Sequence, residues 1–132
     1  MIIERLRYGK DVIEEIERIC REKRVKKGWV SFIGALKSAE VGYYDQKKKA
    51  YEKHTINQPV EILSGSGNVS LKEGKVFIHV HAVLSGKDGR AFGGHLFKGE
   101  IFASELFIMP LKGKLLERVS DNVTGLSLWK KS

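Results

Sequence analysis

The stretch VFIHVHAVL, residues 76–84, decides how this chain folds. It is β-branched and apolar, which is typical of a buried strand. Because side chains alternate between the two faces of a strand, its residues divide into two sets. The even-numbered set is wholly apolar and is expected to face the core: Val76, Ile78, Val80, Ala82 and Leu84. The other set places two histidines side by side on the opposite face: Phe77, His79, His81 and Val83.

A third histidine, His95, follows this strand after a turn-rich segment, residues 86–94. A two-residue Asp88-Gly89 loop would pair position 82 with 95 and point His95 into the core. A three-residue loop over 87–89, with Gly89 left-handed, would pair His81 with His95 on the same face. The glycine favours the second register, and a bulge at Gly93-Gly94 could also correct the face.

Working outward, the remaining apolar runs predict a series of short strands. We expect them at residues 2–8, 29–36, 39–44, 50–56, 60–64, 68–71 and 96–109. Gly65-Ser66-Gly67 is interpreted as a turn between two of them, Gly99 as a break in the last and Pro110 as its end. The segment Leu115–Val119 is compatible with a strand or a short helix.

One helix precedes most of these strands. Asp11 can cap it, and Glu14 and Glu15 suit its first turn because they meet the positive end of the helix dipole. Its apolar stripe recurs at helical spacing: Val12, Ile13, Ile16, Ile19 and Cys20. Gly28 is a plausible stop, and we expect Cys20 to be a core residue.

One helix and many closely spaced strands predict an α+β fold with a central, largely antiparallel β-sheet. At 132 residues the chain has room for one domain, which we expect to span residues 1–132. The single cysteine excludes an internal disulfide and Cys-based zinc sites. No apolar run is long enough for a membrane helix, and no signal peptide is recognisable at the start. We therefore expect a cytoplasmic protein with no membrane partner. The scarcity of Gln beside abundant Lys and Glu is typical of a thermophile.

The chain is basic, with 24 Lys and Arg against 16 Asp and Glu, for a net charge of +8. Basic residues cluster at 23–27, 47–49 and 130–131. Such an excess of positive charge favours DNA or another anionic partner. The alternative is an ordinary solvated surface, because soluble domains commonly carry a net charge of this size. The signatures of helix-turn-helix, zinc-finger and basic-zipper proteins are absent.

His79, His81 and His95 converging from two strands would form a three-histidine metal site with an open coordination position. Zinc is the ion we expect, and neutral imidazole also suits iron, copper and nickel. Glu105 is the candidate catalytic carboxylate, with Glu61 as the alternative. The competing interpretation is that the histidines are structural groups, hydrogen-bonded at a subunit contact.

Several motifs occur in an order that resembles a known family. They are Gly34-Ala35-Leu36, Val41-Gly42-Tyr43-Tyr44-Asp45, Glu61-Ile62-Leu63-Ser64, Gly67-Asn68, His79-Val80-His81 and Gly93-Gly94-His95-Leu96. Together they resemble the plant- and prokaryote-conserved (PPC) domain, over nearly the whole chain to about Met109. The resemblance implies an α+β fold with a central antiparallel sheet, and a homotrimer. It also makes a metal at the histidine positions plausible.

Prokaryotic members of the family are described as DNA-binding by similarity to plant relatives, in which an AT-hook supplies the minor-groove contact. The Arg-Gly-Arg-Pro core of that hook is absent here. In the plant domain a Gly-Arg-Phe-Glu-Ile-Leu segment contacts partner proteins, and only Glu61, Ile62 and Leu63 of it match.

Three functions follow from these observations. The first is a homotrimeric DNA-binding or regulatory protein that acts through its basic surface. The alternative is a metal-dependent enzyme or small-ligand binder that uses His79, His81 and His95. The third is an assembly domain whose histidines lie in a subunit contact.

Overall fold

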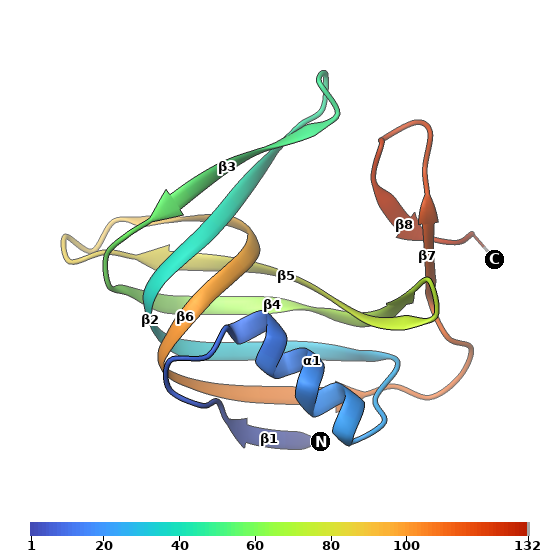
Figure 1. Cartoon of the computed structure of the whole chain (residues 1–132), viewed down its shortest axis with the longest axis horizontal. Helices are drawn as coiled ribbons and strands as arrows, with labels where there is room; N and C mark the ends of the chain where they lie inside the picture. Colours follow the sequence, from blue (N-terminus) through green and yellow to red (C-terminus); the bar gives the residue numbers. More distant parts are fainter. Residues whose placement is uncertain (132) are drawn as a thin grey trace.

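A computed structural model of the chain describes residues 1–131 (Figure 1). Eight strands and one helix make a mostly-β structure with a mixed sheet, which confirms the predicted α+β class. The elements are β1 (Ile2–Arg5), α1 (Val12–Glu22), β2 (Gly28–Asp45), β3 (Ala50–Ile56), β4 (Val60–Lys72), β5 (Lys75–Ser85), β6 (Ala91–Pro110), β7 (Glu117–Ser120) and β8 (Ser127–Trp129).

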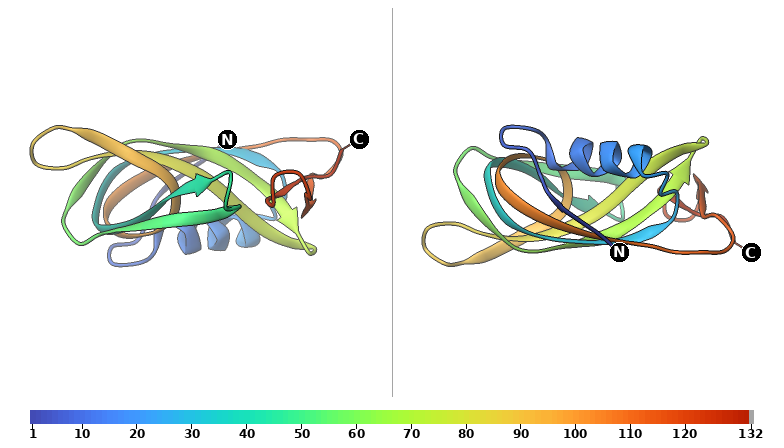
Figure 2. Two further views of the ribbon diagram at one scale, coloured as in Figure 1. Left: turned by 90° about the horizontal axis from the view of Figure 1, so that it is seen from above. Right: turned by 90° about the horizontal axis from the view of Figure 1, so that it is seen from below.

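The sheet curls so that four of its strands close a ring (Figure 2). β2 pairs with both β6 and β4, β4 pairs with β5, and β5 pairs with β6. The two long strands, β2 and β6, make this possible because register shifts between residues 35 and 41 of β2 bend their shared ladder. β1 pairs with the second half of β6. β3 pairs with the second half of β2, and the two together form a projecting arm. Every pairing between strands is antiparallel except that of β4 with β7.

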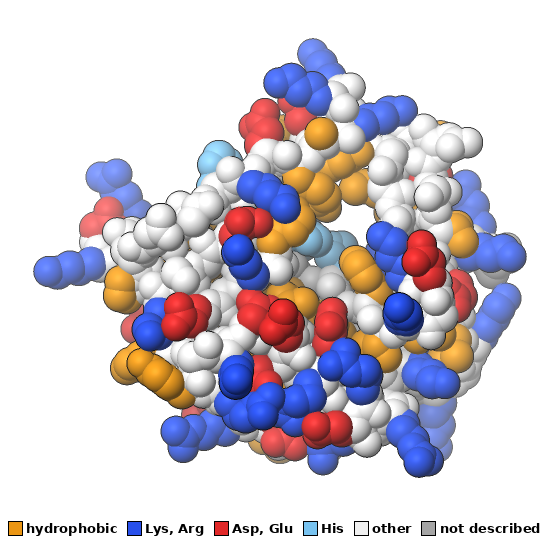
Figure 3. Space-filling view, in the orientation of Figure 1, with side chains coloured by type: hydrophobic (Ala, Val, Ile, Leu, Met, Phe, Trp, Pro, Cys, Tyr) orange, Lys and Arg blue, Asp and Glu red, His pale blue; other side chains and the backbone are white. Residues whose placement is uncertain are grey.

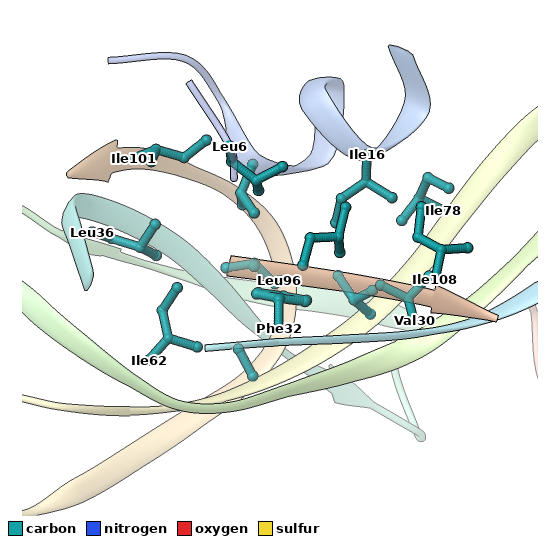
Figure 4. Packing of buried hydrophobic residues seen from close by; sticks show 14 of the residues in the cluster. Leu6, Ile16, Val30, Phe32, Leu36, Ile62, Ile78, Leu96, Ile101 and Ile108 are labelled. Atoms are coloured by element: carbon teal, nitrogen blue, oxygen red, sulfur yellow. The ribbon is translucent and has the colours of Figure 1, made fainter. Parts of the chain in front are cut away.

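Helix α1 covers one face of the curled sheet and closes the core. The predicted apolar stripe packs on buried side chains of the sheet, among them Val30, Phe32 and Ile108 (Figure 4). Asp11 caps the helix by accepting a hydrogen bond from the Glu14 amide at 3.0 Å. Its second oxygen accepts from the Gly99 amide at 2.8 Å, which ties the start of the helix to β6.

The helix ends at Glu22 and not near Gly28, so the predicted stop was wrong. Arg24 adopts a left-handed conformation with φ +56°, and the Val25 amide donates to the Cys20 carbonyl. These two features terminate the helix well over one turn before Gly28, which instead opens β2. Cys20 is fully buried as expected, and burial raises the pKa of its thiol to about 12.

The glycines of residues 65–67 do not form a turn, because β4 runs through them without a break. A side chain at position 65 would strike the Phe32 ring, and one at position 67 would strike the carbonyl oxygen of His79. Both glycines are therefore required by close packing within a continuous strand. The predicted break at Gly99 was wrong for a similar reason, since a side chain there would strike Leu36 beneath an uninterrupted β6.

The segment Leu115–Val119, for which the sequence allowed a strand or a short helix, contributes to strand β7. This strand pairs with β8 as a small hairpin. The hairpin stands apart from the helix and faces the arm formed by β2 and β3 (Figure 1). Among residues 1–131 no helix is both long and apolar enough to span a membrane.

Candidate metal centre

The structure brings His79, His81 and His95 together. His81 lies opposite His95 in the β5–β6 ladder, which is the second of the two predicted registers. Gly89 has φ +80° in the connecting loop, as that register requires. One ring nitrogen from each histidine lies within 4.8 Å of the others, and the Nε2 atoms of His79 and His81 are 3.2 Å apart.

The cluster lies on the face of β5 that points away from the core. Ile78, Val80 and Ala82 are buried on the opposite face, as the alternation predicts. His79 and His95 are half-buried, whereas His81 is exposed. The site is thus held by a packed strand while part of it stays open to solvent.

Burial keeps the half-buried pair of imidazoles neutral. It is the main cause that lowers the pKa of His79 to about 4, and the charge of Arg118 adds to it. Burial likewise lowers the pKa of His95 to about 4, with His81 and Arg118 adding to the effect. Neutral imidazole is the form that coordinates metals, so protons do not compete for these nitrogens near neutral pH.

A further observation supports the fit of this site to a metal ion. Nδ1 of His95 is buried and has no hydrogen-bond partner within residues 1–131. A buried polar atom normally has a hydrogen-bond partner, so leaving this nitrogen without a partner or a metal ion would destabilise the folded protein. Three histidine nitrogens that converge with room for a further ligand are the donor set of His₃ zinc sites.

A cavity of about 340 Å³ opens beside His79 and His95. Figure 3 shows this hollow between the β2–β3 arm and the β7–β8 hairpin, with histidine and basic side chains at its edge. Its lining includes four aromatic side chains: Tyr44, Tyr51, Phe77 and Phe97. Tyr51 packs on the His95 ring with the ring centroids 5.0 Å apart, and Phe97 packs on the same ring at 4.5 Å.

Arg118 of β7 lines this cavity and is only 9% exposed. Its guanidinium donates to Ser70 Oγ at 2.8 Å, to Asn68 Oδ1 at 3.0 Å and to the Ser127 carbonyl at 3.0 Å. It also lies 3.4 Å from Nδ1 of His79. All four partners are uncharged, and burial lowers the pKa of Arg118.

The β7–β8 hairpin is fastened over the cavity by the arm. The Tyr44 hydroxyl donates to the Thr124 carbonyl, and Lys49 Nζ donates to the Asn122 carbonyl at 3.1 Å. Within the turn, Asp121 accepts from both the amide and the hydroxyl of Thr124. The cavity is therefore enclosed by segments far apart in the sequence.

The candidate carboxylates do not join the histidines within one chain. Glu105 is exposed in the second half of β6, opposite Arg5 of β1 and Ile33 of β2. Three ladders separate that part of β6 from β5, and among the described residues no carboxylate belongs to the histidine cluster. Glu61 lies at the start of β4 beside a different cavity, and His54 is exposed on β3.

Sequence reasoning missed Arg118, Asn68 and Tyr51 as residues of the site. Asn68 belongs to a quoted family motif and pairs directly with His79 in the β4–β5 ladder, which could have marked it. Arg118 and Tyr51 come from other strands and approach the histidines through the curl of the sheet, so their local patterns do not mark them.

Residues 1–112 match the Plants and Prokaryotes Conserved (PCC) domain, and the chain belongs to this family. This confirms the resemblance drawn from the sequence motifs. The β7–β8 hairpin, with Arg118, lies beyond the matched residues.

Two solved structures resemble the chain closely. A metal-containing protein from Archaeoglobus fulgidus is 51% identical, with a TM-score of 0.95, and the match covers 98% of this chain and 92% of that one. A plant- and prokaryote-conserved (PPC) protein from Pyrococcus horikoshii is 35% identical with the same TM-score, over 99% and 91% of the two chains.

Two more distant similarities concern proteins with other descriptions. A structure from Ralstonia eutropha JMP134, named "Putative DNA-binding protein", has a TM-score of 0.88 at 24% identity over 98% of this chain and 90% of that one, and shows the fold alone. The bifunctional protein GlmU of a Synechococcus strain is 33% identical over 93 residues. That match covers 70% of this chain and 14% of GlmU, so the chain corresponds to a small part of that protein.

Proposed function

We propose that this protein binds a zinc ion through His79, His81 and His95 and presents it to a small-molecule ligand. The observation that carries the proposal is the convergence of three ring nitrogens within 4.8 Å beside a cavity. The metal-containing relative at 51% identity supports the same conclusion.

Each residue of the site has a definable task. The three imidazoles would hold the ion, and the packed strand β5 fixes the orientation of two of them. Arg118 positions the His79 ring through its Nδ1 atom, while Tyr51 and Phe97 hold the His95 ring. When bound, zinc supplies a Lewis acid with a coordination position for a ligand.

The proposal does not need a catalytic carboxylate. Glu105 lies on another part of the sheet, and within residues 1–131 neither Asp nor Glu lines the cavity. Ligand binding is therefore better supported than a hydrolytic step that uses a carboxylate as general base.

Elemental analysis of untagged protein tests the proposal. We expect close to one zinc per chain, and loss of most of it in His81→Ala. His54→Ala is the matched control, because this histidine is exposed on β3 and does not belong to the cluster. Full zinc content in a His79, His81 and His95 triple alanine variant would refute the proposal, as would failure of the wild type to take up zinc, iron or nickel.

A second candidate function, a DNA-binding or regulatory role, is favoured by the net charge of +8. The exposed Lys47 and Lys48 at the tip of the β2–β3 arm and the exposed Lys130 and Lys131 would contribute to a basic surface. Binding to a mixed-sequence DNA duplex should then weaken steeply with salt and depend little on sequence. No binding at 20–50 mM salt (roughly the low end of such assays) would refute it.

We also infer that the protein assembles as a homotrimer in the cytoplasm. Exposed apolar side chains gather on the outer face of the β1–β6–β2 region, including Ile3, Ile33 and Phe107. Ile3 and Phe107 are direct neighbours in the β1–β6 ladder, so they form one continuous surface. A surface of this kind favours contact with another copy of the chain.

A further inference from the structure

The cavity beside the histidines has an unbalanced charge. Arg118, Lys49 and Lys72 contribute positive side chains to its lining, while no Asp or Glu contributes a negative one among the described residues. The guanidinium of Arg118 is nine-tenths buried and donates only to uncharged acceptors. A buried charge without a counter-charge is costly, and proteins normally pair it.

The shape of the cavity adds a second requirement. Four aromatic side chains belong to the wall, and Arg118 lies near the Phe77 ring and near Trp129, which is outside the lining. Its guanidinium carbon lies 5.2 Å from the centroid of Phe77 and 5.7 Å from that of Trp129. Such a lining accommodates a flat, apolar body, and the cavity volume of about 340 Å³ suits a small molecule.

A metal at the histidines would raise the positive charge further. Three neutral imidazoles do not offset a divalent ion, so the ion and Arg118 would carry about three positive charges side by side. This part of the inference rests on the proposed metal centre. An anion would be attracted by both groups at once.

We propose that this cavity binds a small organic anion, a carboxylate or phosphate monoester on a flat unsaturated body. The anionic group would lie against the part of the wall formed by His79 and Arg118, near the metal position, and the flat body would pack on Tyr51 and Phe97. The β7–β8 hairpin supplies Arg118 and would therefore help to position the anionic group.

Calorimetric titration of the zinc-loaded wild type with benzoate, phenyl phosphate and benzamide tests the proposal. Benzamide is the neutral counterpart of benzoate and has the same shape. We expect benzoate or phenyl phosphate to bind at least about tenfold more tightly than benzamide, equivalent to about 1.4 kcal/mol. The stronger of the two anions identifies the carboxylate or the phosphate as the preferred group. Equal affinity for benzamide and both anions would overturn the proposal.

Two variants locate the binding site. Arg118→Met keeps the side-chain volume and should weaken anion binding at least about tenfold. Because this buried change could prevent folding, Lys72→Met provides a second test at the edge of the cavity, where a several-fold loss is expected. Lys75→Met is its control, since Lys75 pairs with Lys72 across the β4–β5 ladder but does not line the cavity. Equal losses in Lys72→Met and Lys75→Met would contradict the assigned site.

Zinc content separates this proposal from the proposed function. Anion binding by a wild type that fails to take up zinc, iron or nickel would support the cavity and refute the metal centre. Bound zinc with no preference for the anions would leave the metal centre standing and overturn the anion site. His81→Ala helps here, because His81 does not line this cavity and its loss should remove zinc while leaving Arg118 in place.

Discussion

Gly67 of β4 lies directly against the carbonyl oxygen of His79 on the neighbouring strand, with no room for a side chain between them. The position of His79 therefore depends on a residue that carries no functional group. Because Asn68 pairs with His79 in the same ladder and accepts a hydrogen bond from Arg118, this short part of β4 supports both groups of the site.

The first prediction concerns this contact. Gly67→Ala would force the backbones of β4 and β5 apart, so we expect a loss of roughly 3 kcal/mol in the free energy of unfolding. Zinc content should fall as well, because His79 moves with its strand. Chemical denaturation and elemental analysis measure the two effects.

Gly86→Ala is the matched control. An added side chain there has no neighbour closer than 3.6 Å, so stability should change by less than about 0.5 kcal/mol. A Gly67→Ala protein as stable as Gly86→Ala would show that the two strands can separate without cost.

The second prediction is a pH dependence of the metal-free protein. The folded state holds the pKa values of His79 and His95 near 4, below the ordinary value of 6.5. Between these values the unfolded chain binds more protons, so the free energy of unfolding must decrease as the pH falls from about 6.5 to 4. We expect a decrease of roughly 2 to 4 kcal/mol for this interacting pair.

Urea denaturation at several pH values, after removal of metal with a chelator, measures this decrease. A double variant with His79→Gln and His95→Gln lacks both titrating groups and should lose less stability over the same range. An identical pH profile for the two proteins would contradict the assigned pKa shifts.

Much of this site could be predicted from local pattern. Alternation in residues 76–84 put His79 and His81 on one face, and Gly89 selected the register that brings His95 opposite His81. Both inferences use only the geometry of a strand and a turn, which depends on neighbouring residues. The same reasoning correctly placed the Asp11 cap and buried Cys20.

The errors arose where distant segments meet. Residues 65 and 67 are glycines, which by local pattern favour a turn. The structure instead needs them inside a strand, because Phe32 and the β5 backbone approach them too closely for a side chain. Arg118 reaches the histidines because the sheet curls and β7 pairs in parallel with β4. The glycine contacts in β4 and the approach of Arg118 both depend on how distant segments pack, so neither can be recognised from neighbouring residues in the sequence.

The third prediction concerns the only carboxylate in the buried part of α1. The sequence suggested that Glu15 meets the helix dipole, and the structure shows it 2% exposed and bonded to both Arg7 and Arg18. The hydrogen bond from Arg7 is the main cause that lowers the pKa of Glu15 to about 2. This stabilisation is present above about pH 4.5 and is lost as the pH falls toward 2.

Glu15→Gln should therefore lower the free energy of unfolding by roughly 2 kcal/mol at pH 7, with a smaller difference at pH 3. The value is reduced because both arginines are partly exposed to solvent. Glu17→Gln is the comparison, since its ion pair with Arg21 is on the helix surface and should contribute less than about 0.5 kcal/mol. Equal effects of the two substitutions at pH 7 would show that burial gives Glu15 no advantage.

The fourth prediction addresses assembly through the outer face of β1, β2 and β6. Phe107 is 40% exposed there and adjoins Ile3, which is 67% exposed. If this face forms the proposed trimer contact, Phe107→Glu would bury charges near one another in the assembly and shift the protein to monomers. Sedimentation equilibrium measures the change, and a wild type that sediments as a monomer would refute the trimer.

Val123→Glu is the control for a general effect of added charge. Val123 is 82% exposed in the β7–β8 turn, away from β1 and β6, so its replacement should leave the sedimentation unchanged. Zinc content provides a second measurement on the same samples. Because Phe107 lies three ladders from His81, monomeric Phe107→Glu should still bind zinc if each chain holds its own ion. Loss of zinc together with the trimer would instead indicate that assembly completes the metal centre.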